Sequence, residues 1–223
     1  MPMPISVYAD AALLVFDKPA GLLSVPGRGP DKQDCLAARA QAQWPDALVV
    51  HRLDMATSGL LAMARGPQAQ RALSRAFANR AVHKRYVAVV QGRLEPRDWQ
   101  QIDLPIAADW PRRPLQIVDH DRGKPCHTRW RSVAAGRQAD CVGDGEEDGT
   151  QDCTRVELEP VTGRSHQLRV HMQALGHPIL GDALYAPPDV ARRAPRLLLH
   201  AAQLALPHPV TGETLRFASP APF

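Results

Sequence analysis

Two apolar runs separated by a polar segment dominate the first third of the chain. Residues 47–50 and 59–64 are apolar, and His51, Arg52 and Asp54 lie in the segment between them. Apolar runs of this length are typical of buried strands. The pattern therefore predicts a central pair of strands with a carboxylate held where the chain passes from one to the other.

Asp54 is the first candidate for chemistry. An ionised carboxylate among hydrophobic residues is costly unless a cation pairs with it. Groups held in such settings are often functional. The alternative is that Asp54 only caps a turn, which Thr57 and Ser58 close through side-chain hydrogen bonds. The local pattern leaves both interpretations open.

The remaining pattern indicates one domain of mixed α and β structure over residues 1–223. The 223 residues are enough for a sizeable core, and no repeat, linker or second composition regime is visible. The expected elements are strands at 5–9, 13–17, 82–90, 128–133, 155–160, 197–200, 204–206 and 215–217, and helices at 35–44, from 67, and from 165 to 176. In the last helix, Leu168, Met172 and Leu175 form the stripe expected to be buried.

Two segments lack a regular pattern. Residues 103–125 are interrupted by prolines and are expected to be irregular. Residues 136–151 are acidic and rich in glycine, so we expect an inserted, mobile hairpin tip that points away from any RNA.

Composition favours a polyanionic partner only mildly. The formal net charge is +4, with Lys+Arg 27 against Asp+Glu 23, and arginine exceeds lysine. No apolar run approaches the ~20 residues of a membrane span, and no secretory signal is visible, so we expect a cytoplasmic protein without membrane attachment. The 4 cysteines form no Cys-x-x-Cys pair and no zinc-site spacing, which predicts free thiols and no metal.

Several blocks resemble the RluA-type pseudouridine synthases. The matching residues are 51–60, 84–88 and 163–171, with flanking blocks at 17–22 and 177–182. The blocks occur in the family's order and span nearly the whole chain. The runs 22–28 and 51–59 are especially similar to the dual-specificity member of the family, which acts on 23S rRNA and on tRNA.

The resemblance implies a fold and an activity. The fold is the α+β pseudouridine synthase fold, with a mixed, mostly antiparallel central sheet flanked by helices and loops, and a catalytic cleft across the sheet. The chain is too short for an additional amino-terminal S4-type domain. The implied reaction is an isomerisation of uridine, which detaches uracil from its ribose and rejoins it through carbon, and which requires no cofactor and no metal.

The resemblance also assigns roles to residues. It implies Asp54 as the nucleophile, Arg169 as its cationic partner, and Tyr86 as an active-site ring that stacks on uracil or takes part in proton removal. Other matched residues are candidates for contact with RNA, although each is also a plausible surface or structural residue. These candidates are Arg52, His51, Lys84, Arg164 and His166.

Two other functions remain open. An RNA hydrolase of the glycosidase type would use two carboxylates, whereas the three main blocks contain one acidic residue. A non-catalytic RNA-binding or ribosome-assembly factor would keep the basic surface without needing Asp54. For any of these functions we expect a monomer.

Overall fold

The computed structural model describes residues 5–95, 98–135 and 152–223. The chain divides into two compact units, which are described separately: a first unit of Met1–Lys84 with His200–Pro222, and a second unit of Arg85–Leu199 with Phe223. The single domain over 1–223 and the cleft across the sheet stay predictions. The segment 136–151, expected to be a mobile hairpin tip, lies outside the described residues.

The first unit is built on a mixed sheet. Its strands are β1 (Ile5–Ala9), β2 (Leu13–Lys18), β3 (Ala47–Val49), β4 (Ser58–Arg65), β11 (Leu199–Pro207) and β12 (Thr214–Ala218). Strand β4 pairs antiparallel with β2 and β3 and parallel with β11, while β1 and β12 extend the sheet antiparallel on β2 and β11. A 3₁₀ turn, η1 (Pro30–Lys32), precedes helix α1 (Leu36–Gln43).

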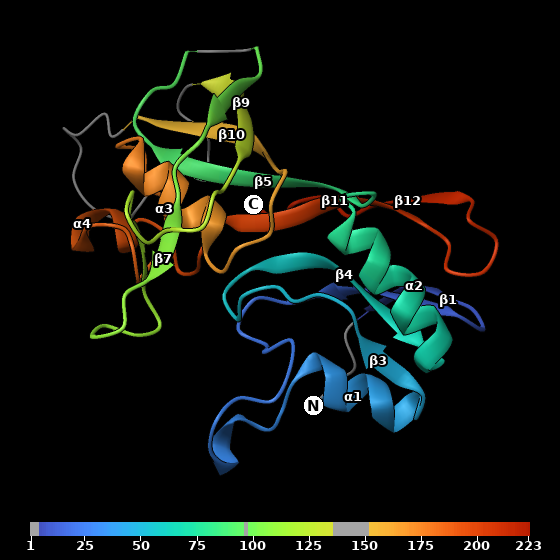
Figure 1. Cartoon of the computed structure of the whole chain (residues 1–223). Coiled ribbons are helices and arrows are strands. Elements are labelled where there is room, and N and C mark those ends of the chain that lie inside the picture. Colours follow the sequence, from blue (N-terminus) through green and yellow to red (C-terminus); the bar gives the residue numbers. More distant parts are fainter. Residues whose placement is uncertain (1–4, 96–97, 136–151) are drawn as a thin grey trace. The chain divides into compact units, whose positions relative to one another are not determined.

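Helix α2 (Gly66–Ala78) covers strands β3 and β4 in this unit (Figure 1). It begins with a proline in its first turn, where the missing N–H is not needed. Ala69, Leu73 and Ala76 are buried and pack with Leu60 and Leu204 of the sheet. The apolar spacing of three and four residues thus becomes the face that the helix presents to the core.

One glycine permits the close approach of β4 to β11. Gly59 has φ 109°, and a Cβ placed there would lie 2.4 Å from the carbonyl oxygen of Ala201. Neither the backbone conformation nor the space suits a larger residue. This position fixes how β4 begins, four residues after Met55.

The second unit contains an antiparallel sheet in the order β5–β10–β9–β6. These strands are β5 (His83–Gln91), β10 (Cys153–Pro160), β9 (Thr128–Ala135) and β6 (Gln100–Ile102). A separate hairpin joins β7 (Ile106–Ala108) to β8 (Gln116–Val118). Helix α3 (Gln167–Ala174) contacts β8, β9 and β10, and α4 (Pro188–Ala191) is a single turn (Figure 1).

Most expected elements are confirmed, and four expectations are wrong. Residues 103–125 are not irregular throughout, because they form the β7–β8 hairpin. Residues 197–200 and 204–206 are not two strands, since β11 is continuous from Leu199 to Pro207. Leu175 is 37% exposed because α3 ends at Ala174. Cys153 is disulfide-bonded rather than free, whereas Cys35 and Cys126 are free; spacing along a chain does not determine which cysteines meet in space.

Candidate active site

Asp54 lies in the first unit, in the short connection between β3 and β4. The backbone N–H of Thr57 donates to the Asp54 carbonyl oxygen at 3.1 Å and closes a turn. Ser58 directs its hydroxyl to Nδ1 of the buried His200, at 2.9 Å. Asp54 therefore does begin a turn, as the local alternative proposed, but the backbone of Thr57 makes the bond. The half-buried carboxylate is presented by a fixed loop next to the exposed Arg52.

His51 is held inside the first unit. Its Nε2 accepts a hydrogen bond from the backbone N–H of Ala62 at 2.9 Å, and its ring stacks on Phe77 with centroids 4.6 Å apart. Burial, followed by the nearby positive charge of Lys84, lowers the pKa of His51 to about 3. Burial also lowers the pKa of Lys84. Near neutral pH His51 is thus an uncharged acceptor that fixes the chain entering the Asp54 connection.

Arg169 lies in the second unit, on α3, and is held by a buried carboxylate. Its Nε and one terminal nitrogen donate to the two carboxylate oxygens of Asp182, at 2.8 and 2.6 Å. The Arg169 and Asp182 side chains are only 4% and 1% exposed. Bidentate pairing of this kind fixes both the position and the plane of a guanidinium. The same guanidinium lies 5.0 Å from the ring centre of Tyr185.

His166 and Tyr185 connect the start of α3 to the β7–β8 hairpin. His166 adopts the left-handed conformation, with φ 55°, at the residue preceding α3. Its Nδ1 lies 2.6 Å from the Tyr185 hydroxyl, which also accepts a hydrogen bond from the backbone N–H of Gln116 at 2.9 Å. Tyr185 therefore contacts two of the residues that the sequence singled out, His166 and Arg169.

The other predicted residues of the second unit occupy separate positions. Tyr86 is half-buried on β5, opposite Leu158 of β10. The Arg164 side chain is exposed, while its backbone N–H donates to Oε1 of Gln167 at 3.1 Å. The two units thus divide the predicted catalytic set: Asp54 belongs to the first, and Tyr86 and Arg169 belong to the second.

The sequence interpretation missed Asp182 and Tyr185 as site residues. Asp182 falls in block 177–182, which was noted only as a flanking match. The signal that could have revealed it is the preceding Gly181, which has φ 72° and would place a Cβ 1.8 Å from the carbonyl oxygen of Arg196. A glycine required by such a turn indicates that the next side chain is directed to a defined place.

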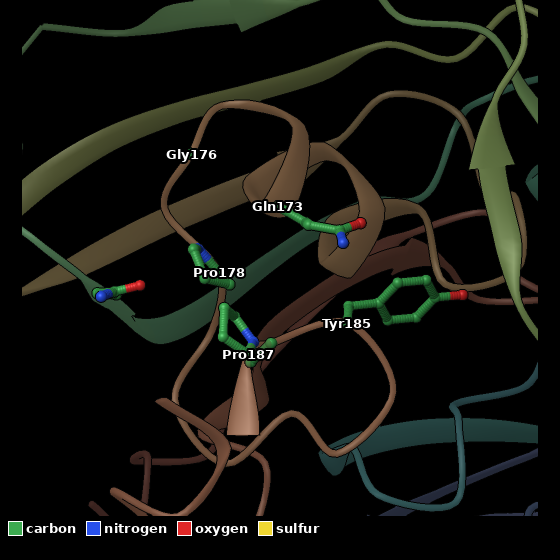
Figure 2. Close-up of a pocket in the computed structure, with 7 residues that line it drawn as sticks. Gln173, Gly176, Pro178, Tyr185 and Pro187 are labelled. Carbon is green, nitrogen blue, oxygen red and sulfur yellow. The ribbon is translucent and has the colours of Figure 1, made fainter. Parts of the chain in front are cut away.

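A shallow pocket of about 470 Å³ opens beside α3 in the second unit (Figure 2). Gln173, Pro178 and Pro187 line it together with the ring of Tyr185. The residues predicted for catalysis and for RNA contact are not among those that line it. We therefore base the site on the contacts of those residues and not on this hollow.

Two searches of the described residues concern metals and membranes. Within 5–95, 98–135 and 152–223, no group of three or more His, Cys, Asp or Glu side chains is arranged to hold a metal ion. Among the helices in the same ranges, none is long and apolar enough to cross a membrane.

Comparison with known proteins now defines the class. Residues 12–174 match the family described as RNA pseudouridylate synthase. This match covers well over half of the chain, and the chain belongs to the RNA pseudouridylate synthase family. It is an isomerase that converts uridine to pseudouridine in RNA. The predicted family and reaction are confirmed, and nothing found supports the non-catalytic alternative.

The similarity to particular relatives extends over the full chain. The dual-specificity RNA pseudouridine synthase RluA of Escherichia coli (strain K12) is 46% identical over 222 residues, which cover 100% of this chain and 95% of the relative. RluA of Yersinia pestis is 46% identical over 219 residues, or 98% of this chain and 100% of the relative. These relatives confirm the predicted similarity to the dual-specificity member.

A solved structure confirms the predicted fold class. Human RNA Pseudouridylate Synthase Domain Containing 1 is 29% identical and superimposes with a TM-score of 0.78, covering 98% of this chain and 83% of that protein. The mixed, mostly antiparallel strand pairing with few helices is therefore the pseudouridine synthase α+β arrangement.

Proposed function

We propose that this enzyme isomerises specific uridines in 23S rRNA and in the anticodon stem-loop of tRNA. The observation that carries the proposal is the 46% identity to dual-specificity RluA over 100% of this chain. The runs 22–28 and 51–59 support the same substrates, because they include the loop that carries the nucleophile. RNA loops suit the reaction because an unpaired uridine leaves its stack at lower cost than one in a duplex.

In the proposed reaction Asp54 is the nucleophile. The bond between uracil N1 and the ribose C1′ breaks, the base rotates, and a bond forms between uracil C5 and C1′. The proton on C5 is then released and N1 takes up a proton, so the product has the mass of the substrate. Asp54 must be ionised to take part, which a fixed cation favours.

Arg169 is the proposed cationic partner of Asp54. A guanidinium keeps its charge at every working pH and offers several donors in one plane. The bidentate contact with Asp182 supports the proposal, because it holds the plane of the Arg169 side chain before any RNA binds. The remaining donors of Arg169 face the carboxylate of Asp54 in this scheme.

The other predicted residues have proposed roles around the target base. Tyr86 stacks on the uracil ring, and its hydroxyl is available when the C5 proton is removed. Arg52, exposed beside the nucleophile, fills the space left by the flipped uridine or binds a phosphate. Lys84, Arg164 and His166 support RNA binding, while His51 acts through the backbone of the Asp54 connection.

The decisive experiment measures release of tritium from RNA labelled at C5 of uridine. The wild-type protein should release the label and leave the RNA mass unchanged, whereas a hydrolase would free uracil and a binding protein would do neither. Asp54→Asn should abolish release, and Asp31→Asn, a change at an exposed residue of η1, should not. Normal release by Asp54→Asn would overturn the proposed mechanism.

The sites and the physical state of the enzyme are proposed in the same terms. Mapping pseudouridines in 23S rRNA and tRNA from cells that lack the protein should reveal unmodified positions in both RNAs. We further propose that it acts as a monomer in the cytoplasm, where both substrates are found. Light scattering of the purified protein tests the first point, and cell fractionation tests the second.

A further inference from the structure

The residue before Asp54 is held on both of its backbone polar groups by one buried side chain. Ser24, which is 5% exposed, donates its hydroxyl to the Leu53 carbonyl oxygen at 2.7 Å. The same oxygen, Oγ of Ser24, accepts a hydrogen bond from the Leu53 N–H at 3.0 Å. This reciprocal pair fixes the peptide that leads into Asp54, although Ser24 and Leu53 are 29 residues apart.

The residue after Asp54 is held by a buried cation. Lys18, at the end of β2, is 0% exposed, and its ammonium group donates to the carbonyl oxygens of Leu22, Pro19 and Met55 at 2.8, 2.9 and 3.2 Å. Met55 directly follows Asp54, and its carbonyl oxygen also accepts the Gly21 N–H at 2.8 Å. The segment 18–24 therefore fixes the chain on both sides of the nucleophile.

The Lys18 charge is more than packing requires. The Met55 carbonyl already has the Gly21 N–H as a donor, so the loop could be closed without a buried ammonium. Burying a charge costs free energy unless it is well hydrogen-bonded, and three carbonyl oxygens provide those bonds here. A positive charge is thereby held one peptide away from the carboxylate of Asp54, where it favours the ionised form.

We propose that Lys18 and Ser24 are positioning residues for the isomerisation, acting on Asp54 through the backbone of Leu53 and Met55. This proposal rests on the proposed role of Asp54 as the nucleophile. It predicts an effect on the chemical step and not on RNA binding, because both side chains are buried beneath the loop. A displacement of about 1 Å at a reacting group can cost roughly 100-fold in rate.

The test separates the rate of the chemical step from RNA affinity. For Lys18→Met and Ser24→Ala, we expect the single-turnover rate of tritium release to fall roughly 100-fold and 10-fold, respectively. The dissociation constant for the same RNA should stay within about twofold, a split that general misfolding does not produce. The conservative variant Ser24→Thr, which keeps the hydroxyl, should recover most of the lost rate.

Controls distinguish failure of this proposal from failure of the proposed function. Lys32→Met removes a charge from an exposed lysine and should keep the wild-type rate. If Lys18→Met does not fold by circular dichroism, the pair Ser24→Ala and Ser24→Thr carries the test. Wild-type rates in the clamp variants, with Asp54→Asn inactive, would overturn only the positioning role. An active Asp54→Asn would overturn the function on which it rests.

Discussion

Replacing Asp182 by alanine should destabilise the second unit strongly. The Asp182 carboxylate accepts two bonds from Arg169 and, through Oδ1, the backbone N–H groups of Leu184 and Tyr185 at 3.0 and 3.2 Å. Asp182→Ala removes all four acceptor contacts at a site that is 1% exposed. The guanidinium of Arg169 then stays buried with the compensating carboxylate missing.

The expected cost is about 4 kcal/mol of unfolding free energy. Removing one partner of a buried ion pair typically costs about 3–5 kcal/mol, because the other charge is left buried. The two backbone N–H groups lose an acceptor as well, but loop relaxation and water can restore part of those contacts. Asp182→Asn keeps one oxygen acceptor without the charge, so its cost should be about half as large.

Urea unfolding followed by tryptophan fluorescence measures this effect in the right place. Of the 4 tryptophans, Trp99, Trp110 and Trp130 belong to the second unit. Asp189→Ala, at an exposed residue of α4, is the matched control and should change stability by less than about 1 kcal/mol. Equal midpoints for Asp182→Ala and Asp189→Ala would refute the claim that this buried pair stabilises the unit.

Four further outcomes are expected. The pKa of His51 is about 3 when folded and ordinarily ~6.5, so its contribution is present above ~6.5 and lost as pH falls towards 3; urea titrations should show about 1–2 kcal/mol lost between about pH 7 and pH 5 in wild type and not in His51→Gln. Gly59→Ala should cost about 3 kcal/mol in the same assay, against about 1 kcal/mol for Gly212→Ala, where a Cβ meets nothing within 4 Å. Tyr86→Phe should release tritium at least about 10-fold more slowly if its hydroxyl takes part in proton removal, and full turnover would exclude that role. Arg52→Ala should weaken RNA affinity or base flipping more than the chemical step, and unchanged affinity and turnover would count against its proposed contact with RNA.

Local sequence patterns predicted the elements whose signal lies within a few residues. The apolar runs around Asp54 became β3 and β4, and the stripe through Leu73 became the buried face of α2. The β7–β8 hairpin escaped because each strand has three residues, too few to show alternation. The end of α3 was placed too late, since helix termini depend on capping and fray by a residue or two.

The site was predictable only as far as family resemblance reaches. It identified Asp54, Tyr86 and Arg169 as candidates, and their roles stay predictions. It did not reveal that His51 accepts a bond from Ala62, or that Arg169 is held by Asp182, because those contacts depend on the packed fold. Charge and composition alone would have assigned His51 to RNA contact, whereas burial makes it an uncharged internal acceptor.

The supports of the two charged residues lie in the flanking blocks and not in the central ones. Block 17–22 supplies Lys18, and block 177–182 supplies Asp182, each buried and each directed at the element that carries a proposed catalytic residue. Each unit therefore orders its own reactive group before RNA binds, which reduces the ordering left for the bound state. It follows that substitutions in these two blocks should slow isomerisation while leaving the RNA-facing side chains unaltered.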